Sequence, residues 1–197
     1  MSVSVVRYTG DALTAALPAL ARLRITVFRG WPYLYDGSLE YEQAYLARFA
    51  GAEGAVVVAA CEGDEMIGAA TASPMAGHAE EFAAPLKAQG LDIGRIFYFG
   101  ESVLLKTYRG RGLGHAFFDA REAHARAAGP FSHTAFCGVV RPDHHPLRPA
   151  DYVPLDSFWR KRGYAKMEGL VAAFAWKDIG ETAQTTKPMQ FWIKRLR

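Results

Sequence analysis

A strand, a glycine-rich turn and a helix follow one another directly between residues 95 and 129 of this 197-residue chain. Residues 96–105 are largely aromatic or β-branched, which predicts a strand buried in a sheet. The turn at 109–114 reads RGRGLG, and apolar residues recur at helical spacing after it. The first turn of a helix has unpaired N–H groups and partial positive charge, and glycine lets an anion approach the backbone. The sequence therefore predicts an anion-binding turn.

The spacing of the glycines indicates which kind of anion site this is. A dinucleotide fingerprint, Gly-x-Gly-x-x-Gly, would need a third glycine where the chain has His115. A Walker-type phosphate loop would end in Gly-Lys-Ser or Gly-Lys-Thr, and neither occurs in the chain. The pattern that remains is Arg-x-x-Gly-x-Gly, formed by Arg109, Gly112 and Gly114.

This pattern resembles the acetyl-coenzyme A signature of the GNAT superfamily of N-acetyltransferases. The segment FWRKRGY at 158–164 also resembles the late helix of that family, which ends in a glycine and an aromatic residue. The resemblance covers roughly residues 55–177. It implies an α/β (α+β) fold with a mixed, mostly antiparallel sheet flanked by helices, in which the fourth and fifth strands splay apart. The alternative is a helix start that merely tolerates glycine.

Composition sets broad limits on the chain. Half of its residues are hydrophobic, so we expect one domain over 1–197. A long apolar run and a basic leader are both absent from the sequence, and there are only two cysteines, so we expect a cytoplasmic protein. The net charge of +3 gives no argument for nucleic acid, and the histidines lack metal-ligand spacing. We therefore expect no nucleic acid, membrane or metal partner, and a monomer or homodimer.

Charge is distributed unevenly along the chain. Residues 1–100 contain seven Lys/Arg and eleven Asp/Glu, whereas residues 101–197 contain sixteen and nine. A polyphosphate cofactor bound by the second half and a neutral or cationic acceptor near the first half would fit this asymmetry. Ordinary surface charge is the other explanation.

The order of elements follows from apolar periodicity. Strands are predicted at 2–8, 55–61, 66–72, 96–105, 131–140, 167–176 and 189–196. Helices are predicted at 12–28, from 38, around 80–89, after the glycine turn and at 155–162. Pro18 is expected to bend or split the first helix. Residues 141–154 contain four prolines and predict an ordered loop beside the site.

The resemblance implies acetyl-CoA as the cofactor, with its pantetheine against the backbone of the fourth strand and its pyrophosphate in the glycine turn. Two further positions come from the late helix. The expected cofactor-binding residues are Val103, Leu104, Leu105, Lys106, Arg109, Gly110, Arg111, Gly112, Leu113, Gly114, Ser157 and Trp159.

The segment between the first two strands is implied by the resemblance to form one wall of the acceptor pocket. Its aromatic residues offer flat apolar faces with polar tips, and acidic side chains within 36–42 could attract an ammonium group. The alternative is an aromatic cluster that only supports a loop. The expected acceptor-binding residues are Phe28, Trp31, Tyr33, Tyr35 and Cys137.

Acyl transfer from a thioester needs a neutral amine, stabilisation of the carbonyl oxygen and a route for the departing thiolate. Glu101, on the fourth strand, is the candidate base; a carboxylate paired with an arginine for structural reasons is the alternative. Trp159 stands where many family members have a tyrosine, and an indole N–H is no useful acid at neutral pH. The candidates to replace that tyrosine are Tyr152, Ser157, His144 and His145, and the thiolate could also leave unaided.

These features predict an enzyme that moves an acetyl group from acetyl-CoA directly to the primary amine of a small molecule. A covalent acyl enzyme on Cys137 is disfavoured, because a buried cysteine is usually inert. The alternatives are a protein or peptide N-acetyltransferase and a non-catalytic acyl-CoA sensor.

Overall fold

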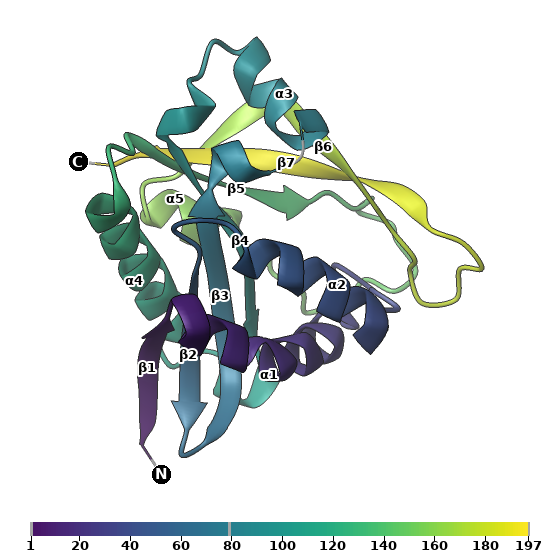
Figure 1. The fold of residues 1–197 in the computed structure, drawn as a ribbon. Coiled ribbons are helices and arrows are strands. Elements are labelled where there is room, and N and C mark those ends of the chain that lie inside the picture. Colours follow the sequence, from purple (N-terminus) through teal and green to yellow (C-terminus); the bar gives the residue numbers. More distant parts are fainter. Residues whose placement is uncertain (1, 79, 197) are drawn as a thin grey trace.

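The structure is a computed structural model that describes residues 2–78 and 80–196 (Figure 1). Seven strands form one sheet in the order β1-β2-β3-β4-β5-β7-β6. The strands are β1 Val3–Tyr8, β2 Val56–Glu62, β3 Glu65–Pro74, β4 Ile96–Leu104, β5 His133–Val139, β6 Ala165–Trp176 and β7 Thr185–Arg195. The helices are α1 Gly10–Phe28, α2 Leu39–Ala50, α3 Glu80–Ala88, α4 Leu113–Ala128 and α5 Asp156–Lys161. The predicted order of elements and the mixed α/β fold are confirmed.

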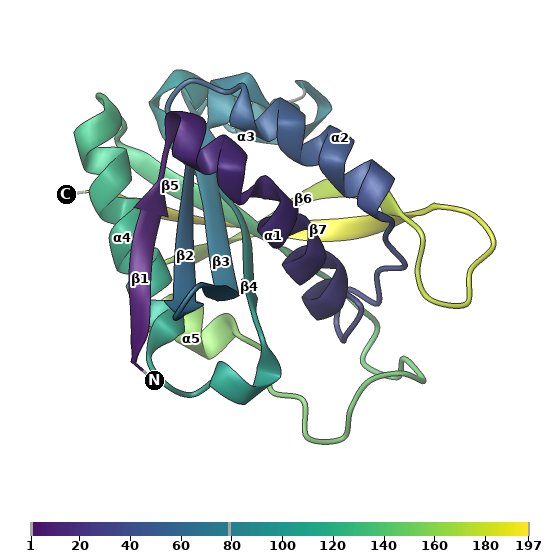
Figure 2. The same ribbon diagram turned by 60° about the horizontal axis from the view of Figure 1, so that its bottom comes forward.

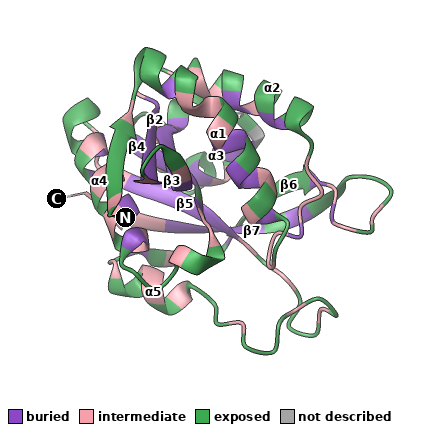
Figure 3. Ribbon diagram, turned by 90° about the horizontal axis from the view of Figure 1, so that it is seen from below, coloured by how far each residue is buried: buried purple, intermediate pink, exposed green. Residues whose placement is uncertain are grey.

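Helices cover both faces of the sheet (Figure 2). α1 and α2 pack on one face, against side chains such as Val57 and Ala69. α4 and α5 lie on the other face, over a cluster that contains Phe97 and Phe99. Strands β2 to β5 between these layers are largely buried, whereas β1, much of β6 and the long connections are exposed (Figure 3). Among the described residues, no helix combines the length and apolarity needed to cross a membrane.

α1 runs unbroken from residue 10 to 28 with Pro18 inside it, so the expectation that this proline splits the helix is wrong. Leu13 and Leu20 lie on either side of Pro18 and are at most 1% exposed. Burial of these side chains favours one continuous helix and offsets the loss of one backbone hydrogen bond at the proline.

β4 and β5 form the one parallel pair of the sheet, and they pair over only three residues each, 96–98 with 133–135. Beyond that point β4 stays on β3 while β5 stays on β7, and Figure 1 shows the two strands diverging. The predicted splay of the fourth and fifth strands is confirmed. We call the space between β4 beyond Tyr98 and β5 beyond Ala135 the β4–β5 opening.

A bulge in β4 decides which face its later side chains occupy. Ala72 pairs with Phe99, but Ala70 pairs with Ser102, so β4 has one residue more than β3 across this step. An extra residue shifts the alternation of side chains by one. As a result Glu101, which regular alternation from Phe99 would put on the α4 face, lies on the α1 face.

Candidate active site

The glycine turn has the geometry of an anion cradle. Gly110 and Gly112 have φ values of 77° and 80°, a left-handed conformation that favours glycine, and a Cβ on either would meet open space. Gly112 is also the N-cap of α4, and no side chain caps that end of the helix. Arg109 and Arg111 are exposed in the same turn. Backbone N–H groups with two guanidinium groups beside them fit the pyrophosphate of a nucleotide cofactor.

The edge of β4 exposes backbone at the opening, but not at every predicted position. The amide of Leu105 donates to the carbonyl of Ile67 at 3.0 Å, so it is used within the sheet. Antiparallel pairing alternates, so the N–H and C=O of Leu104 and Ser102 point away from β3 toward the opening. The Leu104 carbonyl accepts from Nε of Arg109 at 3.3 Å. Ser102 is therefore an edge position that the sequence analysis did not name.

The other predicted cofactor residues differ in how far their side chains are buried. Val103 is fully buried in the cluster beneath α1, and Leu113, the first residue of α4, is buried in the cluster between α4 and the sheet, so neither side chain is at the surface of the turn. Lys106 and Ser157 are exposed. The N–H and C=O of Val103 point to β3 by the same alternation, so the backbone of Leu113 alone of these two remains available to a ligand.

Trp159 lies on the β5 side of the opening. Its ring packs against Phe136 and Trp192 at centroid distances of 5.0 and 5.1 Å. A Cβ at Gly138 would come within 2.9 Å of the indole, so glycine at that position allows the ring to rest on the strand. The Trp159 side chain thus lies on the part of β5 that no longer pairs with β4.

Glu101 is 8% exposed and bound to Arg24 of α1. Nη1 of Arg24 lies 2.7 Å from Oε2 of Glu101, and Nε of Arg24 forms an ion pair with Oε2 of Glu42. The second oxygen of each glutamate, Oε1, is buried and has no hydrogen-bond partner among the described residues. The arginine ion pair that the sequence analysis held as an alternative is therefore present. It leaves one oxygen of Glu101 available, so the role of base stays a prediction.

Arg121 of α4 is a residue that the sequence analysis missed, and it holds the bulge from the opposite face. It is 1% exposed, and Nη1 donates to the carbonyls of Thr71 and Glu101 at 3.2 and 3.3 Å. Nη2 donates to Oγ of Ser102 at 2.9 Å. The amide of Glu101 also donates to Oγ1 of Thr71 at 3.2 Å. These bonds stabilise the bulge that aims Glu101 at the α1 face.

Aromatic rings surround the Arg24 pair. The guanidinium carbon of Arg24 lies 5.1 Å from the centre of the Phe28 ring and 4.6 Å from that of Tyr45. The rings of Phe28 and Tyr33 pack at 4.4 Å. Burial raises the pKa of Tyr33 and Tyr45, so both hydroxyls are neutral at physiological pH. These rings form a wall that already binds one cation.

Cys137 of β5 and Tyr98 of β4 belong to one buried cluster on this side of the sheet. Burial raises the pKa of the Cys137 thiol, so the reactive thiolate is disfavoured. His78 packs on Tyr98 at 4.9 Å and lies 2.9 Å from Oγ of Ser73, and burial lowers its pKa. The sequence analysis did not consider His78.

The segment after α1 is tied to the β6–β7 connection. Backbone hydrogen bonds run from Asp36 to Lys177 at 2.9 Å and from Ile179 to Leu34 at 2.7 Å. Arg141 donates to the carbonyls of Pro32 and Tyr33 at 2.8 and 2.6 Å. Arg141 also pairs in bidentate fashion with Asp178 at 2.6 and 2.9 Å. Residues 32–36, Arg141 and residues 177–179 are thus bonded to one another, and through Tyr33 they continue the aromatic wall formed by Phe28, Tyr33 and Tyr45.

The 141–154 loop meets the segment after α1 at Trp31, and its position beside the site stays a prediction. The Trp31 ring packs against His145 at 5.0 Å and against Tyr152 at 5.8 Å. Its indole Nε1 is buried without a hydrogen-bond partner among the described residues, as is the hydroxyl of Tyr35. His144 is exposed. The structure thus joins His145 and Tyr152 to the aromatic wall.

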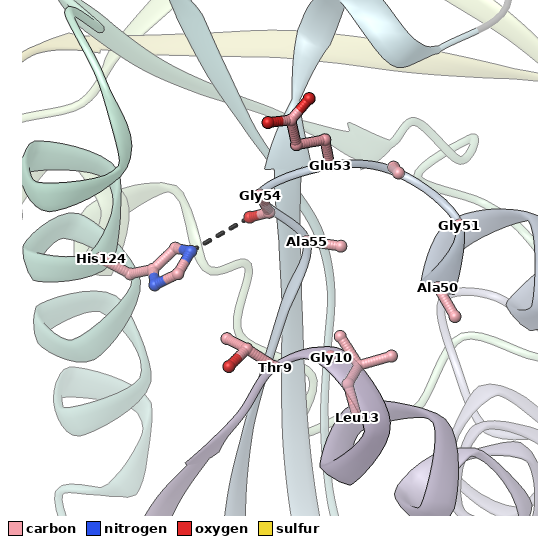
Figure 4. A pocket seen from close by; sticks show the side chains of 10 residues that line it. Thr9, Gly10, Leu13, Ala50, Gly51, Glu53, Gly54, Ala55 and His124 are labelled. Atoms are coloured by element: carbon pink, nitrogen blue, oxygen red, sulfur yellow. Dashed lines mark hydrogen bonds between the residues drawn. The ribbon is translucent and has the colours of Figure 1, made fainter.

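A shallow cavity of about 490 Å³ lies at the other end of α4 from the glycine turn (Figure 4). It is lined by the start of α1, the α2–β2 connection and His124, whose Nε2 lies 3.0 Å from the carbonyl of Gly54. Glu53 is the one Asp, Glu, Lys or Arg among its lining residues. A cavity with a single carboxylate and no Lys or Arg suits a polyphosphate less well than the glycine turn does.

Comparison with known proteins identifies the fold. No family model matches the chain, and no curated protein matches its sequence. Among solved structures, it is similar to a ribosomal-protein-alanine N-acetyltransferase from Brucella melitensis, with a TM-score of 0.62, 14% identity and coverage of 97% and 99% of the two chains.

Two further structures carry the family name. A GNAT-family acetyltransferase from Staphylococcus aureus matches with a TM-score of 0.62, 7% identity and 100% coverage of both chains. One from Streptococcus pneumoniae matches with a TM-score of 0.57, 12% identity and coverage of 98% and 99%. The chain therefore has the GNAT fold over its whole length.

Proposed function

We propose that this chain is an acetyl-CoA-dependent N-acetyltransferase that acts on the primary amine of a small molecule. The observation that carries the proposal is the arrangement along β4. This strand leads into the glycine turn, presents the backbone N–H groups of Ser102 and Leu104 at the opening, and carries Glu101 with one unpaired carboxylate oxygen. Cofactor cradle, acyl-binding edge and base thus come from one continuous segment.

The residues of the turn fit a bound coenzyme A. The amides from Gly110 to Gly114, with Arg109 and Arg111, would hold the pyrophosphate. The edge of β4 at Leu104 would pair with the pantetheine arm, and Trp159 would cover that arm from the β5 side. When bound, acetyl-CoA supplies a thioester as the acyl donor.

The chemistry at the acceptor needs few groups. Oε1 of Glu101 takes the proton that the amine loses as its nitrogen attacks the acyl carbon. The amide of Leu104, which points into the opening, would donate to the carbonyl oxygen as negative charge develops there. As the C–N bond formed, the C–S bond of the donor would break and the thiolate would leave. Tyr152 and His145, which both pack against Trp31, are the candidates that would protonate the thiolate.

A small acceptor is favoured by the closed wall. Arg141 and the backbone bonds between 34–36 and 177–179 close the side on which an extended peptide would enter between the α1–α2 segment and the β6–β7 connection. The Brucella neighbour is named for a protein substrate, so a peptide that begins with alanine belongs in the test beside small amines.

The test measures release of the coenzyme A thiol and the mass of the acetylated product over a panel of primary amines and that peptide. We expect turnover with small amines, and Glu101→Gln should lower turnover at neutral pH by roughly 10²-fold while acetyl-CoA binding is kept. Glu53→Gln, an exposed glutamate at the far end of the sheet, is the matched control. Binding of acetyl-CoA without turnover of any acceptor would support a sensor instead. Turnover of the peptide alone would support a peptide acetyltransferase.

A further inference from the structure

Hydrogen-bond donors are missing around the Arg24–Glu42–Glu101 cluster. Arg24 uses two nitrogens on Oε2 of the two carboxylates. Oε1 of Glu42, in a residue with 0% exposure, and Oε1 of Glu101 are buried acceptors without a donor among the described residues. A buried acceptor without a donor is costly, and a buried anion more so. The Tyr35 hydroxyl, itself buried without a hydrogen-bond partner in the described part of the chain, interacts with Glu42 and can donate there, so Oε1 of Glu101 is the acceptor that still lacks a donor. A group that completes this cluster must therefore donate to Glu101.

The uncharged side chains that surround the cluster do not change its charge. Burial raises the pKa of Tyr33, Tyr35 and Tyr45 and lowers that of His78, so all four are neutral near pH 7. Arg121 is charged but lies on the opposite face, where backbone carbonyls and Oγ of Ser102 accept its hydrogen bonds. On the α1 face of the sheet, the carboxylates of Glu42 and Glu101 therefore share the single guanidinium group of Arg24.

The cations elsewhere on the wall are already bound to carboxylates. Arg141 pairs with Asp178 at 2.6 Å, and Lys187 lies 3.1 Å from Glu181 and 3.5 Å from Asp178. Arg29 and Lys177 lie 3.2 and 2.7 Å from Asp36. Each of these basic residues has a carboxylate partner, so none of them stands ready to receive an anionic group of a ligand.

We infer that the acceptor is a cationic amine that has no carboxylate or phosphate next to its amino group. This inference rests on the proposed function and names the substrate class of the same site. An ammonium group offers three donors, which suit Oε1 of Glu101, and the rings of Phe28 and Tyr45 already lie over the cation of Arg24. The α-carboxylate of an amino acid would instead meet the charge of Glu101, with Glu42 behind it.

The test uses matched ligands. Phenethylamine is compared with phenylalanine, and 3-methylbutylamine with leucine, each with acetyl-CoA in excess and with kcat/KM as the readout. We expect each amine to be preferred by at least about 10²-fold, because the amino acid buries an unpaired carboxylate. The methyl esters of the two amino acids keep the bulk without the charge, so they should recover most of the activity of the amines.

A pair of variants tests the origin of the preference. Glu42→Gln removes one negative charge behind Glu101 and should narrow the ratio of amine to amino acid by about tenfold or more. Glu53→Gln removes the same charge at an exposed site and should leave the ratio unchanged. If Glu42→Gln does not fold, the ester comparison on the wild-type protein decides.

Each outcome bears on a different claim. Amino acids turned over as well as their amines, or esters rejected as strongly as the amino acids, would overturn the inference and leave the acetyltransferase proposal standing. A ratio that Glu42→Gln and Glu53→Gln leave equally unchanged would also overturn it. Absence of turnover with every ligand, although acetyl-CoA binds, would overturn the proposed function, and the inference with it.

Discussion

Replacement of Arg121 by methionine should weaken the bulge in β4 while leaving the candidate base, Glu101, in the chain. Methionine fills much of the same volume but leaves the carbonyls of Thr71 and Glu101 without their donor, together with Oγ of Ser102. An unpaired buried carbonyl costs about 1–3 kcal/mol, and relief from burying the guanidinium charge offsets part of the sum. We expect a net loss of about 2–4 kcal/mol in the free energy of unfolding. In a chain of this length that lowers Tm by roughly 4–16 °C.

The same substitution should lower activity below the new Tm. If the bulge loses its support, the register that aims Glu101 at the α1 face is lost, and turnover should fall by about 10²-fold or more. Arg121→Lys keeps the positive charge and part of the hydrogen bonding, so its turnover should lie between that of the wild type and that of Arg121→Met. Turnover is measured well below the Tm of the least stable variant, with acetyl-CoA affinity as a check on the fold.

A double-mutant cycle identifies the cause of that loss. If Arg121 acts by aiming Glu101, then Arg121→Met should cost little further activity in a Glu101→Gln background. Equal losses in both backgrounds would refute the reasoning. So would wild-type turnover in the folded Arg121→Met protein.

Two further predictions concern the aromatic wall and pH. Trp31→Ala removes the ring that joins His145 and Tyr152, so KM for the acceptor should rise while acetyl-CoA affinity stays unchanged; a lower Tm alone would move the acceptor site elsewhere. Burial lowers the pKa of His78, so between that value and about 6.5 the unfolded chain binds more protons than the folded one. The free energy of unfolding should therefore fall as the pH drops below about 6.5, less steeply in His78→Asn, and an identical pH dependence in both proteins would contradict this assignment.

The sequence predicted the fold well because the fold depends on local patterns. The strand and helix that flank the glycine turn were predicted at 96–105 and after 113, and the structure has β4 at Ile96–Leu104 and α4 from Leu113. Apolar periodicity predicts these elements, and the motif that begins at Arg109 indicates the fold to which they belong. The splayed strands followed from the resemblance, and the ladder of three residue pairs confirms them.

The site was less predictable because its contacts join distant segments. In the sequence, Arg24 is the one charged residue on the apolar face formed by Leu13, Leu17, Leu20 and Val27, but its partners lie 18 and 77 positions away and follow from packing. The bulge at Gly100 and Glu101 cannot be recognised in a strand whose residues 96–99 are buried on both faces, so the face of Glu101 was not readable either. Nothing in the sequence distinguishes Arg121 from other charged helix residues, because its partners are backbone carbonyls at the bulge.

Binding of acetyl-CoA at the glycine turn is the central claim, and calorimetry tests it most directly. The wild-type protein should bind one acetyl-CoA, and Gly112→Asp should lose at least about 10²-fold in affinity, because a side chain and a like charge would enter the phosphate position. Gly90→Asp is the matched control, since Gly90 is also exposed, has a φ of 73° and lies after α3, away from the turn. Wild-type affinity in Gly90→Asp with loss in Gly112→Asp is the predicted result. Unchanged affinity in folded Gly112→Asp, or no binding to the wild type, would contradict the account.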